Sequence, residues 1–263
     1  MTVASLVRLN SVITSLLRSL IDIAAPRVCL GCKTPIAPRE GGTGERAALR
    51  AVLCAACRSD LVLVGDGACR GCARPRKAFA PPRGSRCGRC AREPRGGVRR
   101  TVALYRYTRR GRDLLRQLKF RGRRDAAAPL GRALAIQVER EIPEIVGACG
   151  VALVAPVPMH WTRRLWRGYD HVELMARAAA RELGLPLERV LTRTRRTRPL
   201  FTVPRRDREA VLEGALAASP SVEGRWVLVI DDIRTSGATL ATCGRALREA
   251  GAARVDAAVV GRS

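Results

Sequence analysis

Cysteine is the residue type best placed for chemistry in this chain, because eight of its ten cysteines form four Cys-x-x-Cys pairs before residue 91. Two intervening residues let both sulfurs of a pair reach one tetrahedral metal ion at about 2.3 Å. Small residues in such turns also let backbone N–H groups approach the thiolates. We expect structural zinc, which would supply the folding energy of a segment with few apolar residues. The expected metal ligands are Cys29, Cys32, Cys54, Cys57, Cys69, Cys72, Cys87 and Cys90.

The spacing of these pairs leaves several alternatives open. Consecutive pairing gives C-x2-C-x21-C-x2-C and C-x2-C-x14-C-x2-C, near the usual zinc spacing, while crossed pairing stays open as well. An iron–sulfur cluster and redox-active thiols are the other uses of such pairs. Direct contact with nucleic acid or protein is the alternative to a purely structural role. Cys149 and Cys243 lie outside the pairs, and we expect both to be buried as small hydrophobic residues.

A second chemical motif is the stretch VLVIDDIRTSGATL at residues 227–240. An apolar strand ends there in Asp231 and Asp232, and a short loop leads into a helix. Backbone N–H groups of such a loop and of the helix N-terminus point toward one anion. The hydroxyl groups add donors, and the glycine permits close approach of the backbone. We expect a phosphate to bind among Thr235, Ser236, Gly237 and Thr239.

The two carboxylates narrow the class of phosphate compound. They would repel a phosphate unless they accept hydrogen bonds from hydroxyl groups, and the 2′- and 3′-hydroxyls of a ribose supply such donors. The motif therefore indicates a pocket for a 5-phosphoribosyl compound. A P-loop is excluded, because no GxxxxGK[ST] occurs and the only lysine after residue 77 is Lys119. A strand-to-helix turn with nothing bound is the structural alternative.

The same motif resembles the motif that binds 5-phosphoribosyl 1-pyrophosphate (PRPP) in type I phosphoribosyltransferases. Together with the cysteine pairs, LKFRG at 118–122 and PVPMHWTRRLWRGYD at 156–170, the chain resembles the ComF family of competence-associated, phosphoribosyltransferase-like proteins. The resemblance implies an N-terminal zinc-finger part, a type I phosphoribosyltransferase fold and, in some bacteria, a role in DNA uptake during natural transformation. It implies that Asp231 and Asp232 hold the ribose hydroxyls and that the loop after residues 151–157 faces the pyrophosphate. By the same resemblance, the 5-phosphate is cradled by Thr235, Ser236, Gly237, Ala238 and Thr239.

Three places depart from the family pattern. The run Tyr-Asp-His at 169–171 stands after an Arg-Gly pair where the family commonly has Phe-Asn-Gln. Leu200 stands where a Gln is expected after the Thr-x-Pro of the third motif, and Val211 stands at the position of a typical Asn. These departures leave the phosphate loop whole and bear on acceptor binding and turnover.

If the chain is an enzyme, phosphoribosyl transfer breaks the C1–O bond of PRPP through an oxocarbenium-like state. The leaving pyrophosphate then needs Mg²⁺ and cationic side chains. Arg167 precedes the glycine of the matched motif and is the best candidate, so the predicted catalytic set is Arg167 with Asp231 and Asp232. The other expected PRPP-binding cations are Lys119, Arg121, Arg163 and Arg164.

Two further features lie near this motif. His160 follows PVPM directly and could be a base or a phosphate contact, although a histidine of a surface loop is the alternative. The stretch 192–208 is rich in Arg and Pro, and we expect it to form a mobile hood over the site.

The elements that must position these residues follow from hydrophobic periodicity. Apolar runs predict strands at 101–107, 151–158, 225–232 and 253–260, and amphipathic patterns predict helices at 111–118, 126–141, 172–183 and 239–250. This alternation predicts an α/β domain with a mostly parallel sheet flanked by helices, of the type I phosphoribosyltransferase kind. We expect an amphipathic helix within residues 1–26, a zinc-binding module at 27–97 and the phosphoribosyltransferase-like domain at 98–263.

The charge predicts polyanionic partners. The chain has 49 Lys and Arg against 23 Asp and Glu, a net charge of +26. Nucleic acid, phosphorylated metabolites and anionic lipid are such partners, and a compositional bias toward arginine is the alternative. Aromatic residues are only 3% of the chain, which weakens the case for base stacking.

Three functional hypotheses remain. The first is a PRPP-binding protein or enzyme with Mg²⁺. The second is an accessory protein that binds single-stranded DNA. The third is a zinc-dependent adaptor that docks a competence-machinery protein, such as a helicase or a membrane channel, through the N-terminal helix and the zinc module. No run approaches the about 18 apolar residues of a membrane span, and residues 1–26 have no signal peptide pattern. We expect a cytoplasmic protein and exclude a membrane transporter, a secreted helical bundle and a plain single-core hydrolase.

Overall fold

The structure is a computed structural model. It describes residues 27–36, 44–65, 67–75, 85–92, 97–148, 150–198, 202–204 and 206–263. The helix predicted at 4–24 lies outside the described residues, as do Cys149 and Leu200. Within the described residues, no helix is both long enough and apolar enough to span a bilayer.

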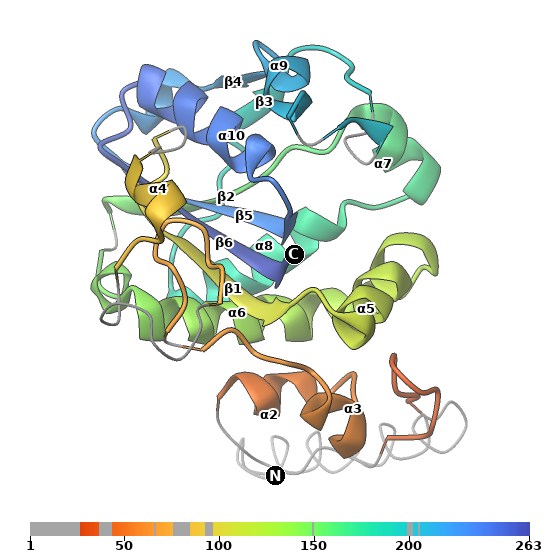
Figure 1. Ribbon diagram of the computed structural model, residues 1–263. Coiled ribbons are helices and arrows are strands. Elements are labelled where there is room, and N and C mark those ends of the chain that lie inside the picture. Colours follow the sequence, from red (N-terminus) through yellow and green to blue (C-terminus); the bar gives the residue numbers. More distant parts are fainter. Residues whose placement is uncertain are drawn as a thin grey trace, which may run out of the picture.

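The centre of the molecule is a four-stranded parallel sheet with the strand order β1-β6-β5-β2 (Figure 1). Its strands are buried along nearly their whole length, as is usual when helices cover both faces of a parallel sheet. The predicted fold class is confirmed. The strands are β1 (Thr101–Arg106), β2 (Ala152–Pro156), β5 (Trp226–Arg234) and β6 (Arg254–Arg262).

Alternate side chains of each strand enter two separate cores, because successive residues of a strand point to opposite faces. Leu228 and Ile230 of β5 pack with α6 (Ala127–Glu141) and α8 (His171–Leu183). Val227 and Val229 pack with α10 (Ala238–Glu249) on the other face. The molecule thus has three layers, with α5 (Arg109–Phe120) on the α6 side.

Smaller elements lie above α10. The strands β3 (Leu191–Arg193) and β4 (Leu216–Ala218) form an antiparallel pair, and α9 (Arg208–Leu212) packs on α10. The described part of the stretch 192–208, predicted as a hood, therefore runs from β3 to the start of α9. The part of the chain that the structure describes also contains α7 (Trp161–Arg167) and the 3-10 helices η1 (Arg124–Ala126), η2 (Pro143–Ile145) and η4 (Pro220–Val222).

The cysteine-rich segment divides between the two outer layers. Its first part, with α2 (Glu45–Leu49) and α3 (Ala55–Ser59), packs below α6 and shares the α6–α8 core (Figure 1). Its second part, with α4 (Gly88–Arg92), lies on the α10 side: Ala73 joins the α10 core, and Gly97 lies against Arg248 of α10.

Strand ends differ from the sequence prediction in an informative way. We expected strands to end at residues 232 and 260, but β5 and β6 each continue for two residues. Ile233 pairs with Gly261 and Arg234 with Arg262, so two arginines enter the sheet at its carboxyl edge. The sequence shows these arginines only as polar residues after an apolar run, which favours a loop.

Candidate functional site

The predicted phosphate motif lies at the carboxyl edge of the sheet. After β2 the chain passes to α7 and to α8 on the α6 side, whereas after β5 it enters α10 on the other side. Connections that leave neighbouring strands toward opposite layers mark the point where open α/β sheets bind ligands. The motif therefore occupies the expected ligand position of this fold.

Asp232 is held by two side chains from two different helices. Its Oδ2 lies 2.6 Å from Lys119 Nζ at the end of α5 and 2.6 Å from His171 Nε2 at the start of α8. Burial alone would raise its pKa, but the charge of Lys119 and the hydrogen bond from His171 outweigh burial and hold the pKa of Asp232 well below its usual range. Asp232 is therefore ionised at neutral pH.

Asp231 has the opposite character. Its Oδ1 accepts the backbone N–H of Asp232 at 2.8 Å. Burial, followed by the charge of Asp232, raises the pKa of Asp231 to about 8. The raised pKa favours sharing of one proton by the pair, whose protonated member can donate a hydrogen bond while its ionised member accepts one. This sharing reduces the repulsion that two full carboxylates would exert on a phosphate.

Residues 169–171, one of the places where the chain departs from the family pattern, fix the start of α8. Tyr169 donates its hydroxyl to the carbonyl of Leu118 in α5. Asp170 caps α8, since its Oδ1 accepts the N–H groups of Val172 and Glu173 at 3.0 and 3.1 Å. His171 then bonds to Asp232. The run 169–171 thereby ties α5, α8 and β5 together around the aspartates.

Arg167 approaches the same group from the end of α7. Its Nη1 lies 3.4 Å from His171 Nδ1, and its guanidinium lies over the ring of Phe120, 5.0 Å from the centroid. The structure thus brings Arg167 and Lys119 together around His171 and Asp232. Arg121 and Arg164 are exposed, and Arg163 belongs to α7 with a side chain outside the described part of the structure.

The loop of residues 235–239, here called the phosphate loop, leads from β5 into α10. Gly237 is the N-cap of α10 with φ +92°, and a Cβ there would lie 2.9 Å from Arg234 Nη2, so the position requires glycine. Ser236 Oγ accepts the N–H of Ala238 at 3.3 Å. Thr239 is half-buried in the first turn of the helix. The loop has the geometry of a helix N-terminus that receives an anion.

Three arginines beside this loop were missed by the sequence analysis. Arg208, the last residue of the stretch 192–208 and the first of α9, donates to Thr235 Oγ1 at 3.0 Å. Arg234 and Arg262 are buried beneath the loop. In a chain this rich in arginine, no local signal separates these three from surface arginines, because their positions depend on strand pairing and on contacts across the fold.

His160 has a structural contact at the start of α7. Its Nδ1 accepts the N–H of Thr162 at 3.3 Å and lies 2.8 Å from Thr162 Oγ1, and its ring stacks on Trp161. These contacts are those of a helix cap, which agrees with the surface-loop interpretation. Cys243 is fully buried in the α10 core, as predicted, and burial raises the pKa of its thiol well above the usual range.

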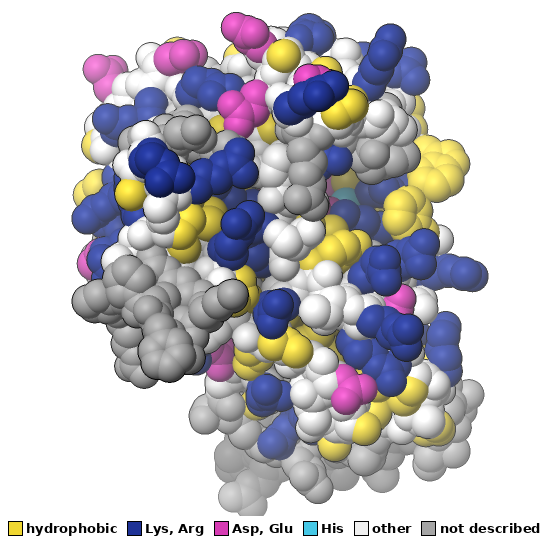
Figure 2. Space-filling model, viewed as in Figure 1, with side chains coloured by type: hydrophobic (Ala, Val, Ile, Leu, Met, Phe, Trp, Pro, Cys, Tyr) yellow, Lys and Arg dark blue, Asp and Glu magenta, His cyan; other side chains and the backbone are white. Residues whose placement is uncertain are grey.

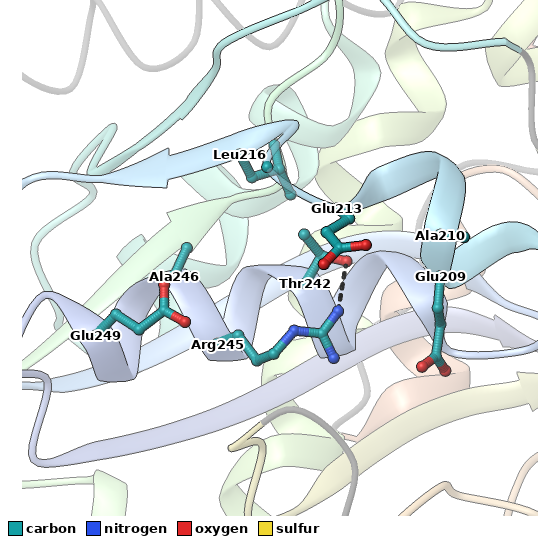
Figure 3. Close-up of a pocket in the computed structure, with 9 residues that line it drawn as sticks. Glu209, Ala210, Glu213, Leu216, Thr242, Arg245, Ala246 and Glu249 are labelled. Atoms are coloured by element: carbon teal, nitrogen blue, oxygen red, sulfur yellow. Dashed lines mark hydrogen bonds between the residues drawn. The ribbon is translucent and has the colours of Figure 1, made fainter.

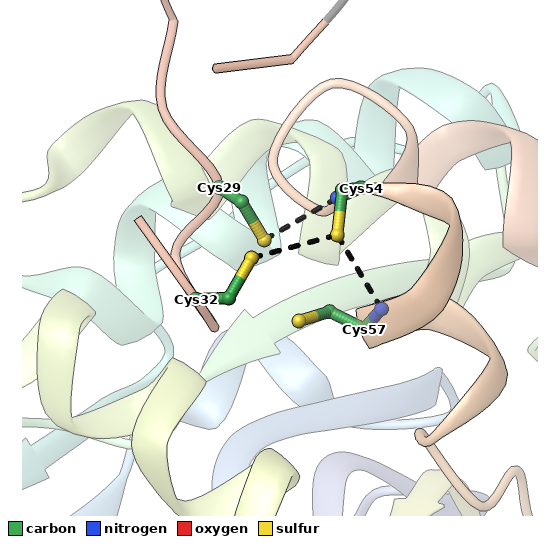
Figure 4. Close-up of side chains that lie close together, drawn as sticks. All are labelled: Cys29, Cys32, Cys54 and Cys57. Carbon is green, nitrogen blue, oxygen red and sulfur yellow. Dashed lines mark hydrogen bonds between the residues drawn. The ribbon is translucent and has the colours of Figure 1, made fainter. Parts of the chain in front are cut away.

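The eight paired cysteines form two clusters with consecutive pairing. Cys29, Cys32, Cys54 and Cys57 converge in the first (Figure 4), and Cys69, Cys72, Cys87 and Cys90 in the second. Within each cluster all sulfurs lie within 4.8 Å of one another. Tetrahedral zinc at about 2.3 Å from each sulfur would separate the sulfurs by about 3.8 Å. The recorded separations of 3.6 Å for Cys32–Cys54 and 3.9 Å for Cys72–Cys87 fit that geometry.

The surroundings of the sulfurs also suit a cation. Backbone N–H groups point at the thiolates, such as those of Cys54 toward Cys29 Sγ at 3.3 Å and of Cys87 toward Cys69 Sγ at 3.1 Å. Burial raises the pKa of the Cys57 thiol. The hydrogen bond between the Cys72 and Cys69 side chains raises the pKa of the Cys72 thiol. Four thiolates this close ionise together only beside a cation, so each cluster could hold one metal ion.

A separate hollow of about 480 Å³ lies between α9, β4 and α10 (Figure 3). Its lining includes Glu209, Glu213 and Glu249, with Arg245 bonded to Thr242 at 3.4 Å. It contains no residue of the aspartate pair or the phosphate loop. Its carboxylates would repel a phosphate, so the hollow is distinct from the candidate site.

Comparisons with known proteins bear on the same region. Residues 173–262 match the family described as "phosphoribosyl transferase domain", a range that includes the aspartate pair and the phosphate loop. DNA utilization protein YhgH of Salmonella typhi is 33% identical over 218 residues, 77% of this chain and 93% of that protein. Competence protein F of Haemophilus influenzae is 26% identical over 219 residues, 75% of this chain and 91% of that protein.

Competence protein ComFC of Bacillus subtilis strain 168 is 26% identical over 205 residues, 76% of this chain and 80% of that protein. Among solved structures, glutamine PRPP amidotransferase from B. subtilis, complexed with ADP and GMP, matches 52% of this chain and 26% of its own at 27% identity. The TM-score of that match is 0.36.

Proposed function

This chain belongs to the ComF family of competence-associated proteins, and we propose that it binds PRPP at the carboxyl edge of its sheet. From the same membership we propose that it acts in the handling of incoming DNA. The observation that most supports PRPP binding is that two aspartates with opposite pKa shifts, Asp231 and Asp232, lie next to the phosphate loop. Both features stand at the carboxyl edge of the sheet, where connections leave neighbouring strands toward opposite layers. Ribose and 5-phosphate are the two parts of PRPP that these groups suit.

Each part of PRPP has a proposed set of contacts. The backbone N–H groups of the phosphate loop and the hydroxyls of Thr235, Ser236 and Thr239 bind the 5-phosphate. Asp231 and Asp232 bond to the ribose hydroxyls, one as a donor and one as an acceptor. The pyrophosphate group contacts the cationic side chains of Lys119, Arg121, Arg163, Arg164 and Arg167. Mg²⁺, when bound with PRPP, would neutralise charge on the pyrophosphate oxygens.

Transfer of the phosphoribosyl group is the proposed reaction. An acceptor nucleophile attacks C1 as the C1–O bond breaks, and the electron pair of that bond leaves with pyrophosphate. Arg167 stabilises the charge that develops on the leaving group. Its stacking on Phe120 and its contact with His171 hold it beside the aspartates. The aspartates orient the ribose while C1 becomes positive.

Calorimetric titration of PRPP with Mg²⁺ into the metal-loaded protein tests this function. We expect saturable binding, and loss of it in the double variant Asp231→Ala/Asp232→Ala. Arg112→Ala on the exposed face of α5 is the matched control and should bind as the wild type does. A well-folded wild-type protein that gives no binding heat would overturn PRPP binding and leave the fold and the family unaffected.

We also propose that each cysteine cluster binds one structural zinc ion, and that the protein is cytoplasmic. Cysteine thiolates that hold a metal ion suit a reducing compartment, where disulfides are rare. Elemental analysis of purified protein should give two zinc ions per chain. Iron, or fewer than two metal ions in folded protein, would contradict the zinc assignment.

A second candidate function, binding of single-stranded DNA, is supported by the exposed face of α7. Trp161, Leu165 and Trp166 are 65%, 73% and 75% exposed, and hydrophobic side chains protrude at the position of α7 in Figure 2. Arginines occupy positions 163, 164 and 167 of the same helix. Exposed aromatic rings among cations are the usual contacts for stacked bases and phosphates.

Fluorescence anisotropy with a labelled oligothymidylate tests this function. We expect the variant Trp161→Ala/Trp166→Ala to bind at least tenfold more weakly, with a steep salt dependence in the wild type. Val62→Ala, at an exposed apolar residue of the cysteine-rich segment, is the control and should bind normally. Equal affinity of the double variant and the wild type would exclude α7 as the DNA surface.

A further inference from the structure

Three consecutive carbonyls of the second cysteine cluster bond to the central sheet. The backbone N–H of Thr101 donates to the carbonyl of Arg70 at 2.7 Å, and Thr101 Oγ1 donates to that of Gly71 at 3.1 Å. Arg262 Nε donates to the carbonyl of Cys72 at 2.6 Å. The turn between Cys69 and Cys72 is thus fixed to β1 and β6, the strands that carry these donors.

The same two sheet residues reach the phosphate loop. Arg262 Nη1 donates to the carbonyls of Arg234 and Thr235 at 3.0 and 3.2 Å. Arg234 in turn donates to Thr101 Oγ1, and its guanidinium lies against Gly237. One side of this buried network therefore touches the cysteine turn, and the other touches the start and the centre of the phosphate loop.

The network is rigid because its members are buried. Thr101 and Arg234 are each 4% exposed, and Arg262 is 6% exposed. A buried guanidinium that loses its acceptors bears a large desolvation cost, so these side chains keep their bonds and transmit a shift of either end. A carbonyl that moves with the turn therefore moves the loop.

Metal ligands define the position of the turn itself. A Cβ on Gly71 would lie 2.9 Å from Cys90 Cβ, so the opposite cysteine pair packs directly on the turn. Cys87 also donates its backbone N–H to Cys69 Sγ. An ion that holds the four sulfurs together thus fixes the three carbonyls that bond to the sheet.

We propose that the second cluster is the structural support of the phosphate loop, with Thr101, Arg234 and Arg262 as positioning residues, so that metal in this cluster sets the affinity for the phosphate group. The part that concerns affinity rests on the proposed PRPP function. The part that concerns loop order does not. The first cluster has no such role, because it packs below α6, and none of the hydrogen bonds described for its two turns reaches Thr101, Arg234 or Arg262.

The test compares one cysteine variant in each cluster. Cys90→Ser should remove one metal ion, and Cys32→Ser, at the exposed ligand of the first cluster, should remove the other. For each variant we measure metal content, hydrogen exchange of residues 235–241 without ligand, and calorimetric affinity for PRPP with Mg²⁺. Cys90→Ser should lose loop protection and bind at least tenfold more weakly. Cys32→Ser should keep loop protection and bind within twofold of wild type.

Two milder variants separate the network from folding. Thr101→Val keeps the shape of the side chain but removes both bonds of Oγ1, and Arg262→Lys keeps the charge but cannot reach three carbonyls. Both should retain two metal ions, lose protection at residues 235–239 and weaken PRPP binding about tenfold. Their thermal unfolding, followed by circular dichroism, should remain cooperative.

The outcomes are distinguishable. Equal loop protection in Cys90→Ser and Cys32→Ser, or normal protection in both network variants, would overturn the proposal. If wild-type protein binds no PRPP, the proposed function fails, and the exchange measurements still decide whether the second cluster orders the loop. Loss of loop protection in Cys90→Ser and in the network variants, but not in Cys32→Ser, supports the proposal that the second cluster orders the phosphate loop.

Discussion

Adjacent aspartates with opposite surroundings make a sharp prediction at the scale of single residues. Asp231 has a raised pKa in the folded state, so its stabilising effect is complete below its ordinary value of 3.8 and is lost as the pH rises toward about 8. Asn cannot ionise and escapes that loss. We therefore expect Asp231→Asn to raise the Tm at pH 8 by about 3 °C. A Tm equal to or below that of the wild type at pH 8 would contradict the raised pKa.

Asp232 should give the reverse result. Its pKa is lowered in the folded state, so its contribution to stability is present above the ordinary value of 3.8 and disappears as the pH falls below it. Asp232→Asn leaves Lys119 without its carboxylate. We expect a Tm about 3–5 °C lower at pH 7, with the difference shrinking below pH 4. Thermal melts across pH 3–8 measure both variants, and a difference independent of pH would count against the ion pair.

His171 provides a third test at this scale, because it departs from the Gln common in the family. A glutamine amide can donate to Asp232 as His171 Nε2 does. We expect His171→Gln to bind PRPP within about threefold of wild type and His171→Ala to bind about tenfold more weakly, the effect of one lost hydrogen bond to a charged group. Calorimetry of both variants decides, and equal losses would mean that the donor at this position is irrelevant.

At the scale of the element, the turn from β5 into α10 depends on one glycine. Gly237→Ala places a methyl group against the guanidinium of Arg234 at a positive φ. We expect at least a tenfold loss of PRPP affinity with the fold retained. Gly184→Ala is the matched control, since Gly184 also has a positive φ but its Cβ would meet nothing within 4 Å. Calorimetry and circular dichroism separate the two, and similar losses in both would contradict the contact argument.

The helices and strands could be predicted from the sequence, whereas the contacts between distant parts of the chain could not. Strands such as β5 are apolar runs because both faces are covered, and this pattern is visible in the sequence. The Asp-Asp-x-x-Thr-Ser-Gly run also indicated where the phosphate motif begins. The burial of Arg234 and Arg262 could not be predicted, because it depends on a hydrogen bond from Arg262 to Cys72, 190 residues away in the sequence. The spacing of cysteines likewise says nothing about which layer each cluster joins.

For the whole molecule, the two clusters should differ in how they release metal. Cys32 of the first cluster is exposed, whereas three of the four cysteines of the second are buried. We expect a chelator to remove metal in two phases, the first of which is missing in Cys32→Ser. Absorbance of a zinc-binding dye follows the release. A single phase that releases both ions together, in wild type and variant alike, would contradict this prediction.

The position of β1 beside β6 has a consequence for the timing of synthesis. Thr101 pairs with Ala257 and Arg106 with Arg262, so the early strand completes its surroundings only when the late one docks. Cys72 is made 190 residues before its partner Arg262, and at about 5–20 residues per second this interval is about 10–40 s. A metal ion bound by the second cluster during that interval would be held by the cluster's own two turns alone. We therefore expect the second cluster of a nascent chain stalled before β6 to exchange metal faster than that of the complete protein.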